Sequence, residues 1–311
     1  MRIASGCTVA LLIAAAAFAA AQTGTSPYDA RIRTQEAIVA DAPGSADGRA
    51  WLSLAVLCQD ATRYDEAEKA YRKSIALLKS GDRALLSDAL DHLGTLYVET
   101  GRSAKAEPLE ERALTIRQDT GDKGAIGTSY AHLAAMDFGK KDLGLAETNA
   151  EIAVSLLAPA HSDAPGSFTA TPEEKMAALE NLALIRCARS ECATAIPDLT
   201  RALELAHKHY TDSSVPVGML DFLLGYAQWK SGNAPLATEP MSRGIQELGT
   251  QLGWGHPTYV AALQQYKTLL EQTGRPGDAA EIAEKIENLE RSRTGNHTTN
   301  RQVALGLIPL P

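Results

Sequence analysis

The side chains best suited to chemistry in this chain are histidines placed near acidic residues. His92 follows Asp88 and Asp91, and His132 lies 40 residues further along the chain. Imidazole nitrogens and carboxylate oxygens both bind transition metals, so these residues could form a metal site if folding brought the two histidines together. A stable site would need more ligands, so we favour two solvated histidines. We therefore expect no bound metal.

Two of the four cysteines are close enough in sequence to react with each other. Cys187 and Cys192 flank what we predict to be a turn between two helices. The sequence leaves open whether they form a local disulfide or remain thiols. Cys58 lies within an apolar helical pattern, which is typical of a buried thiol that packs as a small hydrophobic side chain.

The sequence lacks the motifs that usually carry catalysis. It has no nucleophile elbow, phosphate-binding loop, zinc-binding His-Glu-x-x-His or dinucleotide fingerprint. His207 and His209 lie at a predicted helix end, where a histidine interacts favourably with the helix dipole. We therefore predict that the chain is not an enzyme and binds no cofactor. A metal-dependent module that uses Asp91, His92 and His132 is the alternative.

The elements that position these residues recur along the chain. A small residue opens the second half of a helix–turn–helix pattern six times, at successive spacings of 39, 40, 49, 42 and 42 residues. These markers are Ala67, Ala106, Ala146, Ala195, Ala237 and Ala279. Self-similarity at such a period is typical of a solenoid, in which each unit buries its apolar face against its neighbours.

The second unit shows the pattern most clearly. Leu90, Leu93-Gly94 and Tyr97 lie on one helical face, Gly101 ends that helix, and Ala106 opens the next. This pattern resembles the tetratricopeptide repeat, and its long period is similar to that of kinesin light chains and many bacterial proteins. The resemblance implies an all-α, right-handed superhelical solenoid of about six helix–turn–helix repeats preceded by an N-terminal half-repeat.

The remaining segments flank or interrupt this array. We predict a signal peptide at 1–21, a cap or half-repeat at 22–47, the repeat array at 48–293 and a mobile tail at 294–311. Docking of the apolar end of that tail on the array is the alternative. An insertion at about 158–171 explains the longest spacing. Thr171 and Pro172 then suit the N-cap and the first position of the next helix.

The N-terminus predicts export. Arg2 precedes an uncharged run from Val9 to Ala21, whose last residues fit a signal-peptidase site. This run is short for a spanning helix, which needs about 20 residues. We therefore expect cleavage after Ala21 and a location in the periplasm or cell envelope of a bacterium. An uncleaved anchor that begins near Ile3 is the alternative, and no later run is long enough to span a membrane.

The net charge limits the partners. The whole chain carries a formal charge of −8, and removal of Arg2 with the leader leaves 29 basic and 38 acidic residues. Nucleic acids and anionic membranes require clustered Lys and Arg. We therefore expect neither as a partner.

The resemblance also implies where a partner binds, because the first helix of each repeat lines the concave side in this family. By register, the candidate groove residues are Asp88, Asp91, His92, Glu99, His132, Glu180, Asn181, Phe222, Tyr226 and Trp229. The second unit is acidic, whereas the fifth carries three aromatic residues of the kind that dominate binding energies. For Trp229, packing beneath the next unit is the alternative.

These observations predict a non-catalytic scaffold. An exported array would hold a protein or peptide, basic or aromatic and apolar in character, in its concave groove. An accessory structural subunit of a cell-envelope or secretion complex is the alternative. The sequence does not identify the partner.

Overall fold

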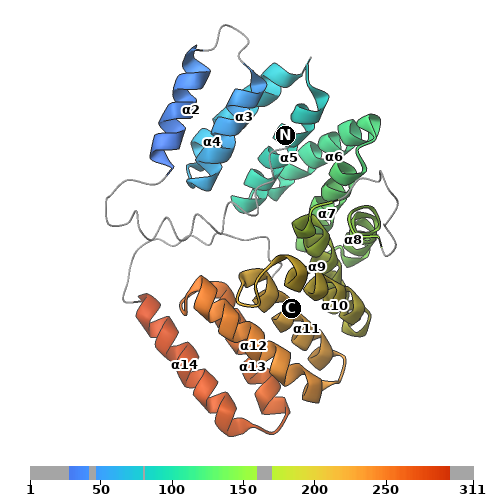
Figure 1. The fold of residues 1–311 in the computed structure, drawn as a ribbon, viewed down its shortest axis with the longest axis vertical. Helices are drawn as coiled ribbons and strands as arrows, with labels where there is room; N and C mark the ends of the chain where they lie inside the picture. Colours follow the sequence, from blue (N-terminus) through green and yellow to red (C-terminus); the bar gives the residue numbers. More distant parts are fainter. Residues whose placement is uncertain (1–27, 42–46, 80, 160–169, 295–311) are drawn as a thin grey trace. The chain divides into compact units, whose positions relative to one another are not determined.

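All regular structure in the described part of the chain is helical. The computed structural model describes residues 28–41, 47–79, 81–159 and 170–294. The predicted signal peptide, the residues from 295 onwards and most of the insertion lie outside these ranges. Within them lie α2 (Asp29–Asp41), α3 (Gly48–Asp60), α4 (Tyr64–Leu78), α5 (Arg83–Glu99), α6 (Ser103–Thr120), α7 (Lys123–Gly139), α8 (Leu143–Leu157), α9 (Pro172–Ala188), α10 (Cys192–His209), α11 (Val215–Lys230), α12 (Ala234–Leu252), α13 (Pro257–Gln272) and α14 (Pro276–Thr294) (Figure 1).

After α2, consecutive helices form six helix–turn–helix repeats, which confirms the predicted all-α repeat solenoid. We call the first helix of each repeat an A helix and the second a B helix, so α3 and α4 form the first repeat and α13 and α14 the sixth. The six marker alanines all lie near the start of B helices and are at most 3% exposed. A small side chain there lets the A and B helices approach closely.

The same three-residue turn joins the two helices of every repeat. Its middle residue has a positive φ in all six cases: Thr62, Gly101, Lys141, Ser190, Gly232 and Gly274. In the second repeat, the N–H groups of Gly101 and Arg102 donate to the carbonyls of Val98 and Tyr97. This is the Schellman arrangement, which satisfies carbonyls at the end of a helix. Three of the six turns place a residue with a side chain in the left-handed region, so glycine spacing alone does not reveal the repeat.

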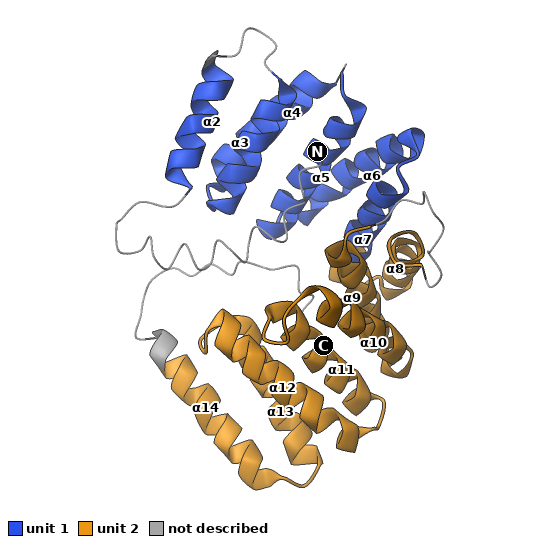
Figure 2. Ribbon diagram, viewed as in Figure 1, with its two compact units in different colours: residues 1–136 blue, residues 137–311 orange. Residues whose placement is uncertain are grey.

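The chain divides into two compact units, residues 1–136 and 137–311, with the boundary inside α7 (Figure 2). The core of unit 1 extends from Tyr28 to Met136, and the core of unit 2 extends from Ala158 to Ile286. Within unit 1, α3 contacts α5; within unit 2, α11 contacts both α9 and α13. Neighbouring A helices therefore pack side by side within each unit.

Two further sequence expectations can be checked locally. Thr171 caps α9 in a capping box with Glu174, and Pro172 occupies the first helical turn as expected. None of the described helices has both the length and the apolar character needed to cross a bilayer.

Candidate functional site

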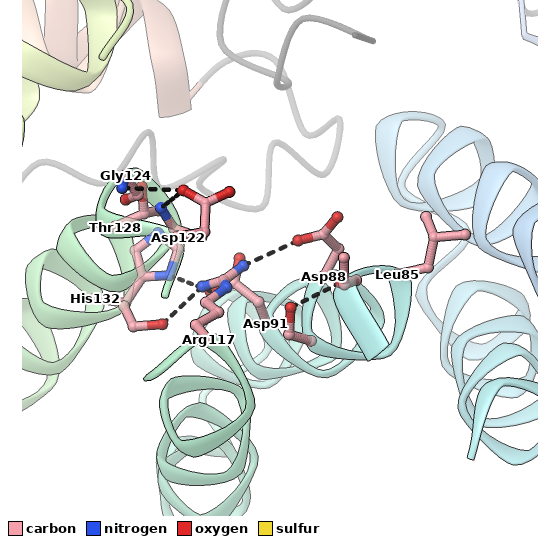
Figure 3. Close-up of polar contacts among 12 residues, drawn as sticks. Leu85, Asp88, Asp91, Arg117, Asp122, Gly124, Thr128 and His132 are labelled. Atoms are coloured by element: carbon pink, nitrogen blue, oxygen red, sulfur yellow. Dashed lines mark hydrogen bonds and ion pairs between the residues drawn. The ribbon is translucent and has the colours of Figure 1, made fainter. Parts of the chain in front are cut away.

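Unit 1 contains a buried network of charged side chains. We call Asp91, Glu110, Arg117 and His132 the polar cluster; α5 supplies Asp91, α6 supplies Glu110 and Arg117, and α7 supplies His132. Figure 3 labels Asp91, Arg117 and His132 of this cluster. Asp91, Glu110 and Arg117 are buried, whereas the His132 side chain is 37% exposed. Side chains from three successive helices thus meet at one point.

Asp91 is the centre of the cluster. Its Oδ1 accepts a hydrogen bond from Arg117 Nη1 at 3.0 Å and lies 2.9 Å from His132 Nδ1. Arg117 also donates to Ser129 Oγ at 2.7 Å. It donates to Asp88 Oδ1 at 3.2 Å as well (Figure 3). The network therefore links the second repeat to the first helix of the third.

Glu110 has an unusual environment for a carboxylate. The residue is 1% exposed, and its Oε2 accepts no hydrogen bond from the described residues. His132 Nδ1 lies 3.7 Å from this oxygen. Gly94 makes room for this side chain, because a Cβ at Gly94 would overlap Glu110 Oε1. The small residue of the repeat pattern therefore accommodates a buried carboxylate here.

The repeats show how exceptional these positions are. Four residues after the marker alanine, where the second repeat has Glu110, other repeats bury Tyr71, Ala150, Leu199 and Met241. Eleven residues after the marker, where the second repeat has Arg117, other repeats bury Leu78, Leu157 and Leu248. The second repeat has thus replaced two core positions by opposite charges.

The charges of the cluster shift one another's ionisation. Burial acts to raise the pKa of Asp91, but His132 and Arg117 outweigh it and hold that pKa well below its usual value. Burial acts to lower the pKa of His132, yet Asp91 and Glu110 raise it well above its usual value. Burial and the charge of Asp91 raise the pKa of Glu110 to about 7. Asp91 is thus the carboxylate most firmly held as an anion.

The structure separates the two histidines that the sequence grouped. His132 contacts Asp91, whereas the ring of His92 stacks on Tyr71, with ring centroids 6.0 Å apart. Burial lowers the pKa of His92. Of the other acidic groove candidates in unit 1, Asp88 is half-buried and Glu99 is exposed. Asp91 faces the core instead of a groove, because Arg117 pairs with it from the B helix.

The aromatic residues expected in a groove are core residues of unit 2. Phe222 and Tyr226 are 2% exposed and Trp229 is 6% exposed. Trp229 Nε1 donates to Gln272 Oε1 of α13 at 3.0 Å, so the indole packs against the next repeat. The expected aromatic groove is therefore corrected: burial of these large apolar surfaces stabilises the core and leaves little for a partner.

The remaining candidate residues of unit 2 lie on α9. Glu180 and Asn181 are half-buried. Desolvation by the surrounding protein raises the pKa of Glu180 to about 7. Glu180 occupies the position that Asp91 has in α5, but no arginine or histidine of the described residues pairs with it. At the end of α9, the Sγ atoms of Cys187 and Cys192 are bonded as a disulfide.

The sequence reading missed Glu110 and Arg117. Both interrupt the apolar face of a predicted B helix, and this interruption was the available signal. It becomes clear only when six repeats are compared position by position, because charged residues are common on the exposed faces of helices.

Comparison with known proteins identifies the repeat. Residues 47–119, which include α3 to α5 and all of α6 except its last residue, match the tetratricopeptide repeat. No curated protein sequence matches the chain. The tetratricopeptide repeat match covers the first two repeats and contains Asp91, Glu110 and Arg117.

Solved structures share the fold at low sequence identity. The APC/C hetero-tetramer Cut9–Hcn1 has a TM-score of 0.64 and 15% identity, over 85% of this chain and 44% of that chain. The kinesin light chain TPR-like repeats of Podosopora anserina have a TM-score of 0.52 and 17% identity, over 66% of this chain and 95% of that chain. PilF of Pseudomonas aeruginosa has a TM-score of 0.55 and 15% identity, over 80% of this chain and 93% of that chain. This chain thus spans less than half the length of the first of these proteins, and the likeness is one of tetratricopeptide repeat architecture.

Proposed function

We propose that the chain is a non-catalytic scaffold whose unit 1 binds a basic segment of a protein partner across the C-terminal ends of α3 and α5. Tetratricopeptide repeat folds are generally scaffolds for protein–protein interaction, and they are generally non-catalytic.

The observation that carries this proposal is a pair of poorly compensated carboxylates. Asp60 is the last residue of α3 and Glu99 is the last residue of α5, and both are exposed. The helix dipole is negative at this end, so it disfavours an anion there. A cationic side chain of a partner would relieve both charges.

The surroundings of the two carboxylates strengthen this argument. Desolvation raises the pKa of both, and the charge of Asp60 raises that of Glu99 further. Gln59 holds Glu99 in place by a 2.9 Å hydrogen bond from Nε2, and Tyr71 donates to Gln59. Arg31 and His92 both act to lower the pKa of Asp60, but together they offset only part of the desolvation. The carboxylates are therefore positioned but incompletely neutralised.

One groove on the B-helix side of unit 1 is lined by basic side chains and by no acidic ones. A groove of about 470 Å³ between α4 and α6 is lined by Arg72, Lys79, Lys105 and Arg112. A basic segment would be repelled there and attracted to the ends of the A helices. A basic partner would therefore bind at the acidic ends of α3 and α5 and not in the basic groove between α4 and α6.

Matched charge variants test the proposal. The purified chain would be used as bait in an extract of its source, beside the double variant Asp60→Asn/Glu99→Gln and the control Asp65→Asn/Glu111→Gln. The control removes two exposed acidic charges from B helices and leaves the net charge equal to that of the test variant. We expect the wild type and the control to retain a partner that the test variant loses, with binding that weakens as salt rises. Equal retention by all three proteins would contradict the proposed surface.

We also propose that the chain is exported to the periplasm or cell envelope. The apolar N-terminal run supports this, and so does the disulfide between Cys187 and Cys192, because disulfides persist in oxidising compartments. N-terminal sequencing of the protein from its source should begin at Gln22. A mature chain that begins at Met1 would contradict cleavage and favour the anchored alternative.

A further inference from the structure

Three side chains of the polar cluster have the chemistry and spacing of metal ligands. The ligand atoms of Asp91, Glu110 and His132 all lie within 4.8 Å of one another. His132 Nδ1 is 2.9 Å from Asp91 Oδ1 and 3.7 Å from Glu110 Oε2. Bonds of about 2.1 Å in tetrahedral geometry separate two ligand atoms by about 3.4 Å. The two distances from His132 Nδ1, to Asp91 Oδ1 and to Glu110 Oε2, therefore differ from this separation by about half an ångström or less.

Glu110 supplies an independent reason to expect a cation here. Its Oε2 is buried beside the other two ligand atoms and accepts no hydrogen bond from the described residues. Burying a carboxylate oxygen without a partner is costly. A cation between Glu110, Asp91 and His132 would lie closer to this oxygen than His132 Nδ1 does at 3.7 Å, and would replace the missing hydrogen bond.

The residues around these ligands support them. Gly94 leaves the space that Glu110 occupies. The other repeats have an apolar residue at the position equivalent to Glu110. Arg117 hydrogen-bonds Asp91, in the way that residues behind metal ligands usually orient them. Asp88 pairs with Arg117 and balances its charge. The carboxylates of Asp91 and Glu110 can then balance a divalent cation.

We propose that Asp91, Glu110 and His132 bind one divalent transition-metal ion of the zinc type, in exchange for the Nδ1 proton of His132, which is released to solvent. One imidazole and two carboxylates suit zinc, whereas magnesium and calcium prefer sites made of oxygen alone. The partly exposed His132 leaves an approach for the ion and for a fourth ligand from solvent. Glu110 is the ligand that the sequence pattern of Asp91, His92 and His132 lacks, so the structure offers a metal site where the sequence alone predicts none. The site is independent of the proposed partner surface.

The test is direct titration of the full chain with zinc. Protein without an affinity tag would be stripped with a chelator and titrated with ZnCl₂ by calorimetry, and with Co²⁺ by visible absorption. We expect one Zn²⁺ per chain and the strong visible bands of four-coordinate Co²⁺. Glu110→Gln and His132→Gln should each weaken binding at least about tenfold.

The chain contains a matched control for adventitious binding. His207 and Asp212 form an exposed pair with Nδ1 and Oδ1 2.8 Å apart, similar to His132 and Asp91. His207→Gln should leave zinc binding unchanged. Circular dichroism would check that each variant folds. If Glu110→Gln does not fold, His132→Gln alone tests the proposal, because His132 is partly exposed. Absence of zinc binding by the wild type, or binding that His132→Gln leaves intact, would overturn the proposal.

Discussion

Arg117 occupies a position where three of the other repeats have a buried leucine, and it is stabilised there only by its partners. Loss of one partner of a buried ion pair leaves an uncompensated charge and costs about 3–5 kcal/mol. We predict a loss of this size in the free energy of unfolding for Arg117→Leu, although leucine occurs at the equivalent positions Leu78 and Leu248. Urea unfolding followed by circular dichroism would measure it.

A double-mutant cycle separates the charge from the packing. The first repeat has Leu52 where the second has Asp91, so Asp91→Leu/Arg117→Leu would give the second repeat the apolar pair of the first. Replacing a buried ion pair by apolar residues is often neutral. We expect the double variant to recover most of the stability that Arg117→Leu loses. Simple addition of the two single losses would mean that the Asp91–Arg117 pair is not the cause.

Glu180 gives a prediction about pH. Its pKa is raised in the folded protein from its ordinary value of 4.5 to about 7 by desolvation. The folded state therefore holds this proton more tightly than the unfolded state, and stability falls as pH rises through that window. Glu180→Gln should be close to wild type in stability below pH 4.5 and more stable above pH 7. Urea unfolding across this range would measure the difference.

Glu204→Gln is the control for this experiment, because Glu204 is exposed on the neighbouring helix α10. Its stability difference from the wild type should not grow between the two pH limits. A flat difference for Glu180→Gln as well would contradict desolvation of Glu180.

The sequence predicted which helix carries each candidate residue but not which side chains contact it. Register placed Asp91, His132 and Trp229 on the correct helices, but it did not say which neighbours cover them. The local pattern places Asp91 in a groove, because it does not reveal that Arg117, 26 residues further along the chain on a B helix, pairs with it. The local pattern likewise places Trp229 in a groove, because it does not reveal the contact with Gln272 in the next repeat. Burial by a distant helix is the information that a local pattern lacks.

At the scale of the elements, prediction succeeded because the pattern repeats. The six marker alanines located six hairpins, since a small residue is required wherever an A helix and a B helix cross closely. The turns are less visible in the sequence. Gly101 fits its left-handed conformation, whereas Thr62 adopts the same conformation without the freedom of glycine. The shared backbone geometry is thus more regular than the residues that form it.

The turn residues provide a prediction about strain. A residue with a Cβ costs about 1–2 kcal/mol in the left-handed region. Thr62→Gly should therefore raise the free energy of unfolding by about 0.5–1 kcal/mol, after the greater entropy of glycine in the unfolded chain is deducted. Gly101→Ala should lower it by about 1 kcal/mol. Thermal and urea unfolding would measure both changes.

Gly139 serves as the matched control. It lies at the end of α7 without a positive φ, and a Cβ there would meet no atom within 4 Å. Gly139→Ala should therefore be neutral or stabilising. A loss equal to that of Gly101→Ala would show that backbone conformation does not explain the difference.

For the whole molecule, stability should be a local property. Each helix of a solenoid packs against its neighbours in sequence, so a defect affects nearby repeats most. The two units have separate cores, one from Tyr28 to Met136 and the other from Ala158 to Ile286. The response to damage in one repeat should therefore decrease along the chain.

Gly225→Ala is the substitution that tests this locality. A Cβ at Gly225 would lie 2.8 Å from the carbonyl oxygen of Ala237 and 2.9 Å from the amide nitrogen of Met241, so α11 and α12 would have to separate. Such overpacking costs about 1–3 kcal/mol. Hydrogen exchange measured by mass spectrometry should show reduced protection in α11 and α12, a smaller reduction in α13, and unchanged protection in α3 to α6. Gly277→Ala, where a Cβ would meet no atom within 4 Å, should leave exchange unchanged throughout. Equal loss of protection in α3 to α6 and in α12 would mean that the array unfolds as one cooperative block, because a local defect would then weaken every repeat alike.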